Sequence, residues 1–174
     1  MDAKVNSAVS TNEFVISCLF DAPRDRVWRA WTERDHLLKW FGPAGYTMQQ
    51  AKLDLRPDGI FHYALRAPDG QTMWGKWTFR EIVAPERLVM VSCFSDEMGR
   101  ITRHPMSTSW PLETLSTTTF EEQGGKTILT IRWAPWNANE SERNTFAGAH
   151  SSMQQGWGGT FEELAAYLAK SNSK

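Results

Sequence analysis

The sequence predicts an α+β fold in which a curved antiparallel sheet wraps around a long C-terminal helix. Residues 13–20 form a β-rich run that precedes two short helical segments. A series of strand-like runs joined by short turns then extends from residue 47 to residue 136, as expected for an antiparallel meander. Apolar residues recur at steps of three and four from 139 to 170, which is typical of one helix face. Separation of strands from helices favours α+β.

The N-terminal part begins with residues 1–12, which we expect to be a flexible tail. Residues 13–20, "EFVISCLF", are rich in β-branched and aromatic side chains and predict a strand. The next segment, "DAPRDRVWRAWT", predicts a helix with Pro23 in its first turn. Thr32 and Asp35 resemble a capping box, which predicts a second short helix that ends at Gly42 and Pro43.

The central part predicts strands separated by breaks with turn chemistry, such as "PDG" and "QGG". The predicted strands are 47–56, 59–67, 71–83, 86–94, 113–122 and 126–136. Residues 95–112 interrupt this pattern with a long, weakly patterned loop. Loops of this length are usually functional lids or disordered.

The last helix is predicted from about Asn139 to Lys170, with a tail at 171–174. Gly156, Gly158 and Gly159 surround Trp157 in its middle, although a helix-interior glycine costs about 1 kcal/mol against alanine. Our preferred interpretation is tight packing of the helix against the sheet, with Trp157 filling the space. The alternative is that the small residues leave room and allow bending, which would suit a gate.

Composition excludes several partner classes. The chain has 174 residues, of which 41% are hydrophobic and 22% charged, as in soluble globular domains. Its formal net charge is −1 without a basic run, which argues against a nucleic-acid partner. No signal peptide or bilayer-length apolar run is evident, so we expect no membrane insertion. We interpret Cys18 and Cys93 as buried free thiols of a cytoplasmic protein.

Catalytic and metal signatures are missing from the sequence. The four histidines, His36, His62, His104 and His150, are dispersed over different predicted elements. There is no HExxH, CxxC, P-loop or GxSxG pattern. We therefore expect no metal and no cofactor.

Several segments together resemble a known family. They are "DAPRDRVWRAWT", "WFGP", "LDLRPDG", "WGKWTFREIVAPERLV", "TTTFEEQGGKTILTIRW" and "GWGGTFEELAAYLA". In this order they resemble START-like helix-grip domains of the SRPBCC superfamily, and more narrowly bacterial homologues of the activator of heat-shock-protein-90 ATPase. The resemblance covers residues 13–170, which we expect to form a single domain. It implies an apolar cavity between sheet and helix, where relatives hold lipids, sterols, polyketides or other hydrophobic molecules.

The candidate lining residues are aromatic residues and methionines that strand and helix periodicity places on the cavity side. Nine tryptophans are generous for one core of this size, which favours some of them lining a cavity. The candidates are Trp40, Phe61, Tyr63, Trp77, Phe79, Met90, Trp133, His150, Met153, Trp157 and Phe161. The same residues also describe an ordinary core, so the cavity itself is implied by the resemblance. Tyr63 or His150 would orient a ligand by hydrogen bonding.

Other polar residues have structural interpretations. Alternation places His62 opposite Tyr63 and therefore toward solvent. Asp54 and Arg56 share a strand face, which favours a salt bridge over ligand binding. The acidic residues Glu121, Glu122, Glu162 and Glu163 are interpreted as solvated faces.

The leading hypothesis is binding of a small hydrophobic or aromatic molecule in the cavity. One alternative is an enzyme of the cyclase, dehydratase or hydrolase type, with Tyr63 or His150 as acid or base. Another is a protein-interaction module with a chaperone partner, by analogy with the ATPase activator. A homodimer through an exposed sheet edge also stays open.

Overall fold

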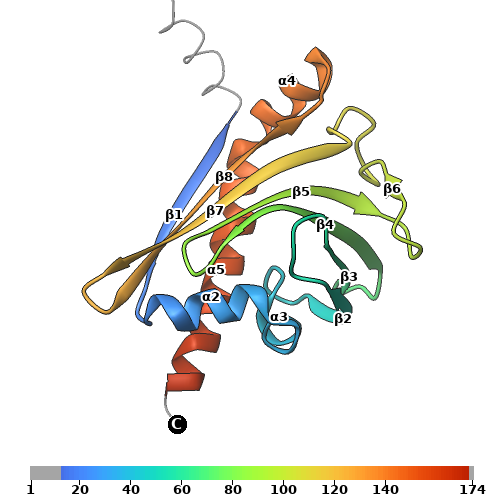
Figure 1. Ribbon diagram of the computed structural model, residues 1–174. Coiled ribbons are helices and arrows are strands. Elements are labelled where there is room, and N and C mark those ends of the chain that lie inside the picture. Colours follow the sequence, from blue (N-terminus) through green and yellow to red (C-terminus); the bar gives the residue numbers. More distant parts are fainter. Residues whose placement is uncertain (1–12, 173–174) are drawn as a thin grey trace, which may run out of the picture.

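The computed structural model describes residues 13–172 and places them in one antiparallel sheet with four helices, which is the α+β class that the sequence predicts. Strand β1 (Phe14–Phe20) is followed by α2 (Arg24–Thr32) and α3 (Arg34–Trp40). The next strands are β2 (Thr47–Leu53), β3 (Ile60–Arg66), β4 (Thr72–Val83), β5 (Arg87–Ser95), β6 (Ile101–Thr102), β7 (Glu113–Gln123) and β8 (Lys126–Trp136). Helices α4 (Glu140–Gly148) and α5 (His150–Asn172) end the described chain (Figure 1).

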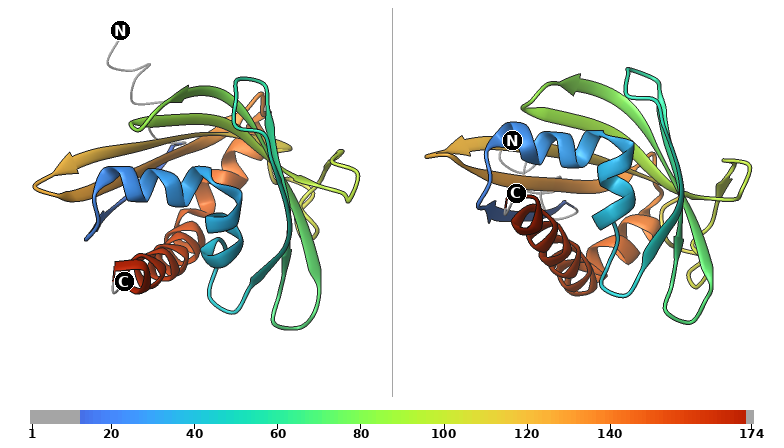
Figure 2. Two further views of the ribbon diagram at one scale, coloured as in Figure 1. Left: turned by 60° about the horizontal axis from the view of Figure 1, so that its bottom comes forward. Right: turned by 90° about the horizontal axis from the view of Figure 1, so that it is seen from below.

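The sheet has the order β1-β8-β7-β5-β4-β3-β2, with the short β6 paired to β5. Apart from the short β6, consecutive strands are therefore neighbours from β2 to β8, which confirms the predicted meander. Strand β1 closes the order by pairing with β8, from Phe14 opposite Trp133 to Phe20 opposite Thr127. Figure 2 shows the sheet curving around α2, α3 and α5, which lie on its concave side. This is the predicted helix-grip arrangement.

The core fills the concave side of the sheet. Its most deeply buried side chains include Trp31 of α2, Leu88 of β5, Leu129 of β8 and Leu164 of α5. Full burial of such a side chain contributes about 1.5–3 kcal/mol each. No helix among residues 13–172 is long and apolar enough to cross a bilayer.

The predicted capping box at Thr32 is wrong. Thr32 is the last residue of α2, and its hydroxyl donates a 2.8 Å hydrogen bond to the Trp28 carbonyl in the preceding turn. Such back-bonding is an alternative use of a threonine hydroxyl at a helix end. Helix α3 instead begins after Glu33, which makes no side-chain capping hydrogen bond.

The expected single C-terminal helix is two helices separated at Ala149. A capping box of Asn139 and Glu142 starts α4. Gly148 ends α4, consistent with the low helix propensity of glycine. Ala149 has φ −100° and ψ 6°, so the helix register breaks there.

The glycines around Trp157 do not serve tight packing, so our preferred interpretation is wrong. A Cβ atom added to Gly156, Gly158 or Gly159 would meet no atom within 4 Å. Helix α5 continues unbroken through this segment, and the helix break lies at Ala149 instead. The glycines therefore leave open space beside α5. The predicted tail at 1–12 and residues 173–174 lie outside the described residues.

Candidate ligand-binding cavity

A cavity of about 570 Å³ lies between the concave face of the sheet and the start of α5. Its volume falls within the range of about 300–1,000 Å³ that small-molecule sites occupy. Strands β3, β4, β5, β7 and β8 supply one side, and α2, α5 and the segment after β5 supply the rest. Ser152 and Gly156 of α5 are exposed and also border the cavity, which places its mouth beside the open space at Gly156.

One wall of the cavity is aromatic. The indole rings of Trp31 and Trp77 stack with centroids 6.2 Å apart and planes 20° apart. Trp157 stacks on Trp31 in the same manner, at 6.1 Å and 21°. These three tryptophans, which all border the cavity, form what we call the aromatic wall. Offset stacking at such spacings is favourable beyond the area buried, so this wall is preorganised.

Tyr63 borders the aromatic wall because Gly75 makes room for it. The two residues are directly paired between β3 and β4. A Cβ atom on Gly75 would approach the Tyr63 Cζ atom to 2.5 Å and the hydroxyl more closely still. The Tyr63 ring therefore lies across the glycine. Burial raises the pKa of the Tyr63 phenol, as does the neighbouring Cys93, whereas a hydrogen bond from Trp77 lowers it. The phenol stays protonated and can donate a hydrogen bond.

In contrast to the aromatic wall, the part of the cavity surface on β7 is polar, because a row of hydroxyl groups borders the cavity there. Thr114, Ser116 and Thr118 alternate along the strand, and all are buried. Ser92 of β5 is paired directly with Thr114 and extends the row. We call these four residues the hydroxyl wall. Buried hydroxyl groups are normally hydrogen-bonded, so an apolar cavity with such a row is unusual.

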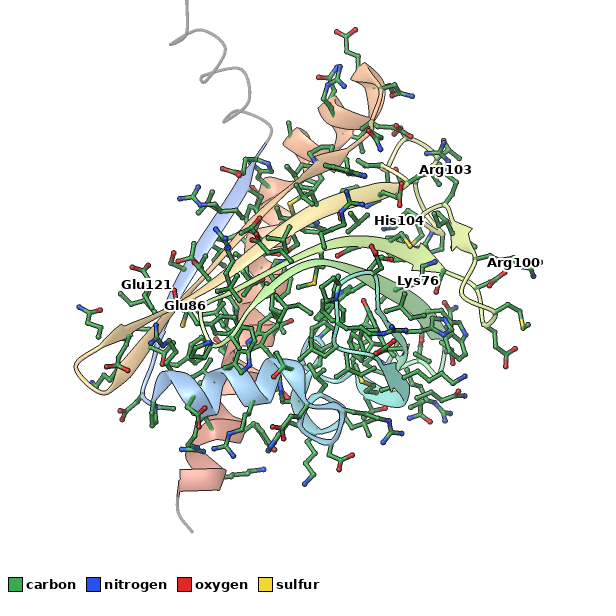
Figure 3. The ribbon with its side chains drawn as sticks, in the orientation of Figure 1. Lys76, Glu86, Arg100, Arg103, His104 and Glu121 are labelled. Atoms are coloured by element: carbon green, nitrogen blue, oxygen red, sulfur yellow. The ribbon has the colours of Figure 1, made fainter. Side chains whose placement is uncertain are left out.

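The segment between β5 and β7, residues 96–112, covers one end of the cavity, and we call it the strap. His104, Trp110 and Pro111 of the strap border the cavity. Arg103 holds the strap to α4 through a 2.5 Å ion pair with Glu142, and its guanidinium also donates to the Trp110 carbonyl at 3.1 Å. Figure 3 shows Arg103 and His104 at the strap end of the sheet, away from Glu86 and Glu121 at the other end.

The anchoring of the strap depends on the charge of Glu142. Hydrogen bonding to Arg103, assisted by the Asn139 backbone N–H, lowers the pKa of the Glu142 carboxyl. The same carboxyl completes the capping box of α4. One side chain therefore both starts α4 and fixes the strap. A second link is the 2.8 Å hydrogen bond between the hydroxyls of Thr145 and Ser109.

His104 is held as a neutral ring. Its Nδ1 accepts a 2.9 Å hydrogen bond from the Met106 backbone N–H. The ring packs edge-on against Phe94 at 4.8 Å and lies 5.8 Å from Trp110. Burial lowers the pKa of His104, which favours the neutral ring, and because Nδ1 accepts from Met106 the proton of that ring sits on Nε2.

The candidate lining residues separate into two groups. Tyr63, Trp77, Met90, Trp133, Met153 and Trp157 border the cavity. Trp40, Phe61, Phe79, His150 and Phe161 do not border it and pack behind its surface or beside it. The Trp40 indole donates to the Ala30 carbonyl at 2.8 Å, and Phe161 packs edge-on against Phe20. His150 packs between Phe14 and Phe146, with its buried Nε2 unpartnered.

Sequence reasoning missed the hydroxyl wall as well as Trp31 and Trp110. The signal for the hydroxyl wall was present in "TLSTTTF". Phe120 faces the core, and alternation then places Thr118, Ser116 and Thr114 on the same face. Trp110 gave no such signal, because it lies in the strap, where no periodicity predicts its direction.

The remaining polar residues do not form a catalytic set. The histidine ring of His62 stacks on Trp74 at 5.0 Å and approaches the Asp96 carbonyl, outside the described lining. Asp54 and Arg56 form the predicted ion pair at 2.7 Å. Within residues 13–172, no cluster of three or more His, Cys, Asp or Glu side chains could hold a metal.

Comparison with known proteins identifies the family to which the chain belongs. The family model described as "Activator of Hsp90 ATPase homolog 1-like protein" matches residues 21–169. The chain belongs to this family. This match confirms the resemblance seen in the sequence. The comparison with curated proteins gives no match.

Solved structures of bacterial proteins share the fold. A protein from Arthrobacter aurescens is 28% identical, with 93% of this chain and 88% of that chain covered and a TM-score of 0.76. Protein Ms6760 from Mycobacterium smegmatis is 23% identical, with 92% of each chain covered and a TM-score of 0.73. Protein NE0264 from Nitrosomonas europaea is 22% identical, with 95% and 99% covered and a TM-score of 0.74. The family fits a ligand-binding or interaction module in general.

Proposed function

We propose that this protein binds a small hydrophobic or aromatic molecule in the cavity between the sheet and α5. The observation that carries the proposal is the cavity of about 570 Å³ with the stacked indoles of Trp31, Trp77 and Trp157 on one side. A ligand ring gains about 25 cal/mol for each Å² of apolar surface buried, before association costs are subtracted. Because stacking on Trp31 holds the indoles of Trp77 and Trp157 in place, little of that gain is lost in ordering the wall.

The free cysteines support a cytoplasmic location for this function. Both cysteines, Cys18 and Cys93, are free and lie on strands. Burial raises the pKa of the Cys18 thiol, which keeps it in its unreactive protonated form. The proposal places the protein in a reducing compartment, where it would carry or sense its ligand.

The alternative of an enzyme has weaker support. Tyr63 is a poor base because burial keeps its phenol protonated. His150, the other candidate acid or base, lies outside the cavity lining. Tyr63 instead fits a role in orienting a ligand, and His150 fits a role in packing between Phe14 and Phe146.

The direct test is native mass spectrometry of the protein purified from its own cells, followed by organic extraction of any bound molecule. We expect a stoichiometric apolar compound, and its loss on replacing Trp157 with alanine. A clean ligand-free mass, with no thermal shift across a lipid and aromatic library, would contradict the proposal. That result would favour an interaction module, to be tested by capture of the heat-shock ATPase.

A further inference from the structure

The hydroxyl wall lies next to the aromatic wall in a fixed register. Trp77 of β4 is paired directly with Ser92 of β5, and Ser92 is paired directly with Thr114 of β7. Adjacent strands lie about 4.8 Å apart, so the hydroxyl wall begins one strand from the indole of Trp77. A flat ring resting on Trp77 would therefore present one edge to β5 and β7.

The hydroxyl wall has unused hydrogen-bonding capacity. The Thr114 hydroxyl makes only a long 3.4 Å contact to the Ser92 carbonyl. No hydrogen bond within the described part of the chain occupies the hydroxyls of Ser116 and Thr118, and neither is among its fully buried unpartnered atoms, so both open onto the cavity. The indole N–H of Trp31, by contrast, is buried without a partner among residues 13–172. An unpaired buried N–H costs free energy, and a ligand oxygen within reach would remove part of that cost, while the open hydroxyls can pair with the same ligand.

The cavity lining carries no charge. It contains no Asp, Glu, Lys or Arg side chain. Its titratable residues are Tyr63, Cys93 and His104, and the surroundings favour the neutral form of each. An ionised ligand would lose its hydration here without gaining a counter-ion, which is strongly unfavourable.

We propose, building on the function proposed above, that the cavity selects uncharged ring compounds bearing a hydrogen-bonding oxygen. The rings lie against Trp77 and Trp157, and the oxygen lies on the hydroxyl wall at Ser116 and Thr118. The aromatic wall supplies most of the affinity. The hydroxyl wall and the absence of charge supply the selectivity.

Three naphthalenes of nearly equal shape test this selectivity: 2-ethylnaphthalene, 2-acetylnaphthalene and 2-naphthoate. Equilibrium dialysis at pH 7.5 gives the three dissociation constants. We expect 2-acetylnaphthalene to bind about 5-fold more tightly than 2-ethylnaphthalene, as one added hydrogen bond predicts. We expect it to bind at least about 30-fold more tightly than 2-naphthoate, because the carboxylate has no counter-ion.

Two variants locate the oxygen. Ser116→Ala and Thr118→Val should bring the affinity for 2-acetylnaphthalene down to that for 2-ethylnaphthalene and leave the latter unchanged. The matched control is Thr117→Val, on the same strand but with its side chain on the opposite face, which should change neither affinity. Because these substitutions nearly preserve side-chain volume, thermal unfolding should show that all three variants fold.

The outcomes separate the two proposals. If none of the three compounds binds, both the function and the selectivity proposed here are overturned. If 2-ethylnaphthalene or 2-naphthoate binds as tightly as 2-acetylnaphthalene, the cavity still binds aromatic rings but the selectivity is overturned. If selectivity holds but Thr117→Val abolishes it as strongly as Thr118→Val, the assignment to the hydroxyl wall is overturned.

Discussion

The two walls of the cavity differ in what they contribute to the folded protein. The aromatic wall is part of the core, because Trp31 is 2% exposed and contacts the rings of Trp40, Phe41 and Phe120. The hydroxyl wall presents the hydroxyls of Ser116 and Thr118 to the cavity without a protein partner, so it contributes less to the core than apolar side chains would. Groups that contribute less to stability than the alternatives are expected at functional sites. The difference indicates that the hydroxyl wall is present for recognition, whereas the aromatic wall serves both stability and binding.

The largest effect is expected from the centre of the aromatic wall. Replacing Trp31 with alanine should lower the free energy of unfolding by about 3–5 kcal/mol, since it removes a large side chain that is 2% exposed and packed against several other rings. Trp157→Ala should cost clearly less stability, because Trp157 is only half-buried, but it should weaken ligand binding. Urea denaturation measures both. Equal stability losses at the two positions would contradict the division between core and cavity surface.

Trp74 is the matched comparison for Trp157 in binding. Trp74 also borders the cavity, but its indole stacks on His62 and takes no part in the aromatic wall. Replacing Trp74 with alanine should therefore weaken 2-acetylnaphthalene binding less than replacing Trp157. A larger loss at Trp74 would place the ligand ring at the Trp74 side of the cavity and contradict its position on the aromatic wall.

Loosening the strap should affect both walls of the cavity, because the strap covers the end of the cavity where the two walls meet. Arg103→Gln should destabilise the strap by about 1 kcal/mol, since Arg103 is half-exposed in its ion pair with Glu142. Hydrogen exchange of the amides in 103–111 should then become faster. The matched control, Glu140→Gln in the first turn of α4, should leave this exchange unchanged.

The strap also predicts an acid dependence. The pKa of Glu142 is lowered in the folded protein, so its contribution is complete above the ordinary Glu pKa of about 4.3. It is lost as the pH falls through the lower folded value. Glu142→Gln should remove this dependence from the exchange rates of the strap. An unchanged acid dependence in that variant would show that another group anchors the strap.

The hydroxyl wall should give the opposite sign from the aromatic wall. Thr118→Val replaces a hydroxyl that opens onto the cavity without a protein partner by a methyl group of the same size, so we expect a small gain in stability of at most about 0.5–1 kcal/mol. The same change in Thr117→Val, on the other face of β7, should have a smaller effect. Thermal unfolding of the ligand-free variants measures this gain. Destabilisation by Thr118→Val would show that the hydroxyl has a partner in the folded protein.

The smallest effect is a pH dependence of binding near neutrality. Burial lowers the pKa of His104, so the folded strap favours the neutral ring and is weakened as the pH falls below about 6.5. Affinity for 2-acetylnaphthalene should fall a few-fold between pH 7.5 and pH 5.5. In His104→Gln, which can still accept from Met106 but does not titrate, the affinity should stay flat over this range. If the affinity depends on pH equally in the unsubstituted protein and in His104→Gln, His104 is not the group responsible.

The fold could be predicted from the sequence because its signals are local and periodic. The order of strand-like runs predicts the meander, and apolar spacing places Met153, Trp157 and Phe161 toward the sheet. The break at Ala149 was missed, because Phe146 and His150 keep helical spacing across it. Capping boxes are similarly ambiguous: the pattern at Thr32 makes none, whereas Asn139 and Glu142 form one.

The site was harder to predict than the fold. Strand alternation predicts which face of the sheet a side chain lies on, but not whether that side chain reaches the cavity. Alternation places Phe61, Tyr63 and Phe79 on the concave side, yet only Tyr63 borders the cavity. The reason is the neighbour: Gly75 leaves space for the ring of Tyr63, whereas Phe61 is covered by Tyr63 and Trp77. The choice of aromatic residues as candidates also passed over the small hydroxyl residues of β7.

The most direct test of the account is to locate a bound ring by nuclear Overhauser effects between 2-acetylnaphthalene and the protein. We predict contacts from the naphthalene protons to the indoles of Trp77 and Trp157, and from the acetyl methyl to the methyl of Thr118. The contradicting result is a compound that binds but contacts only other sites, such as the small pocket bordered by His36 and Tyr167.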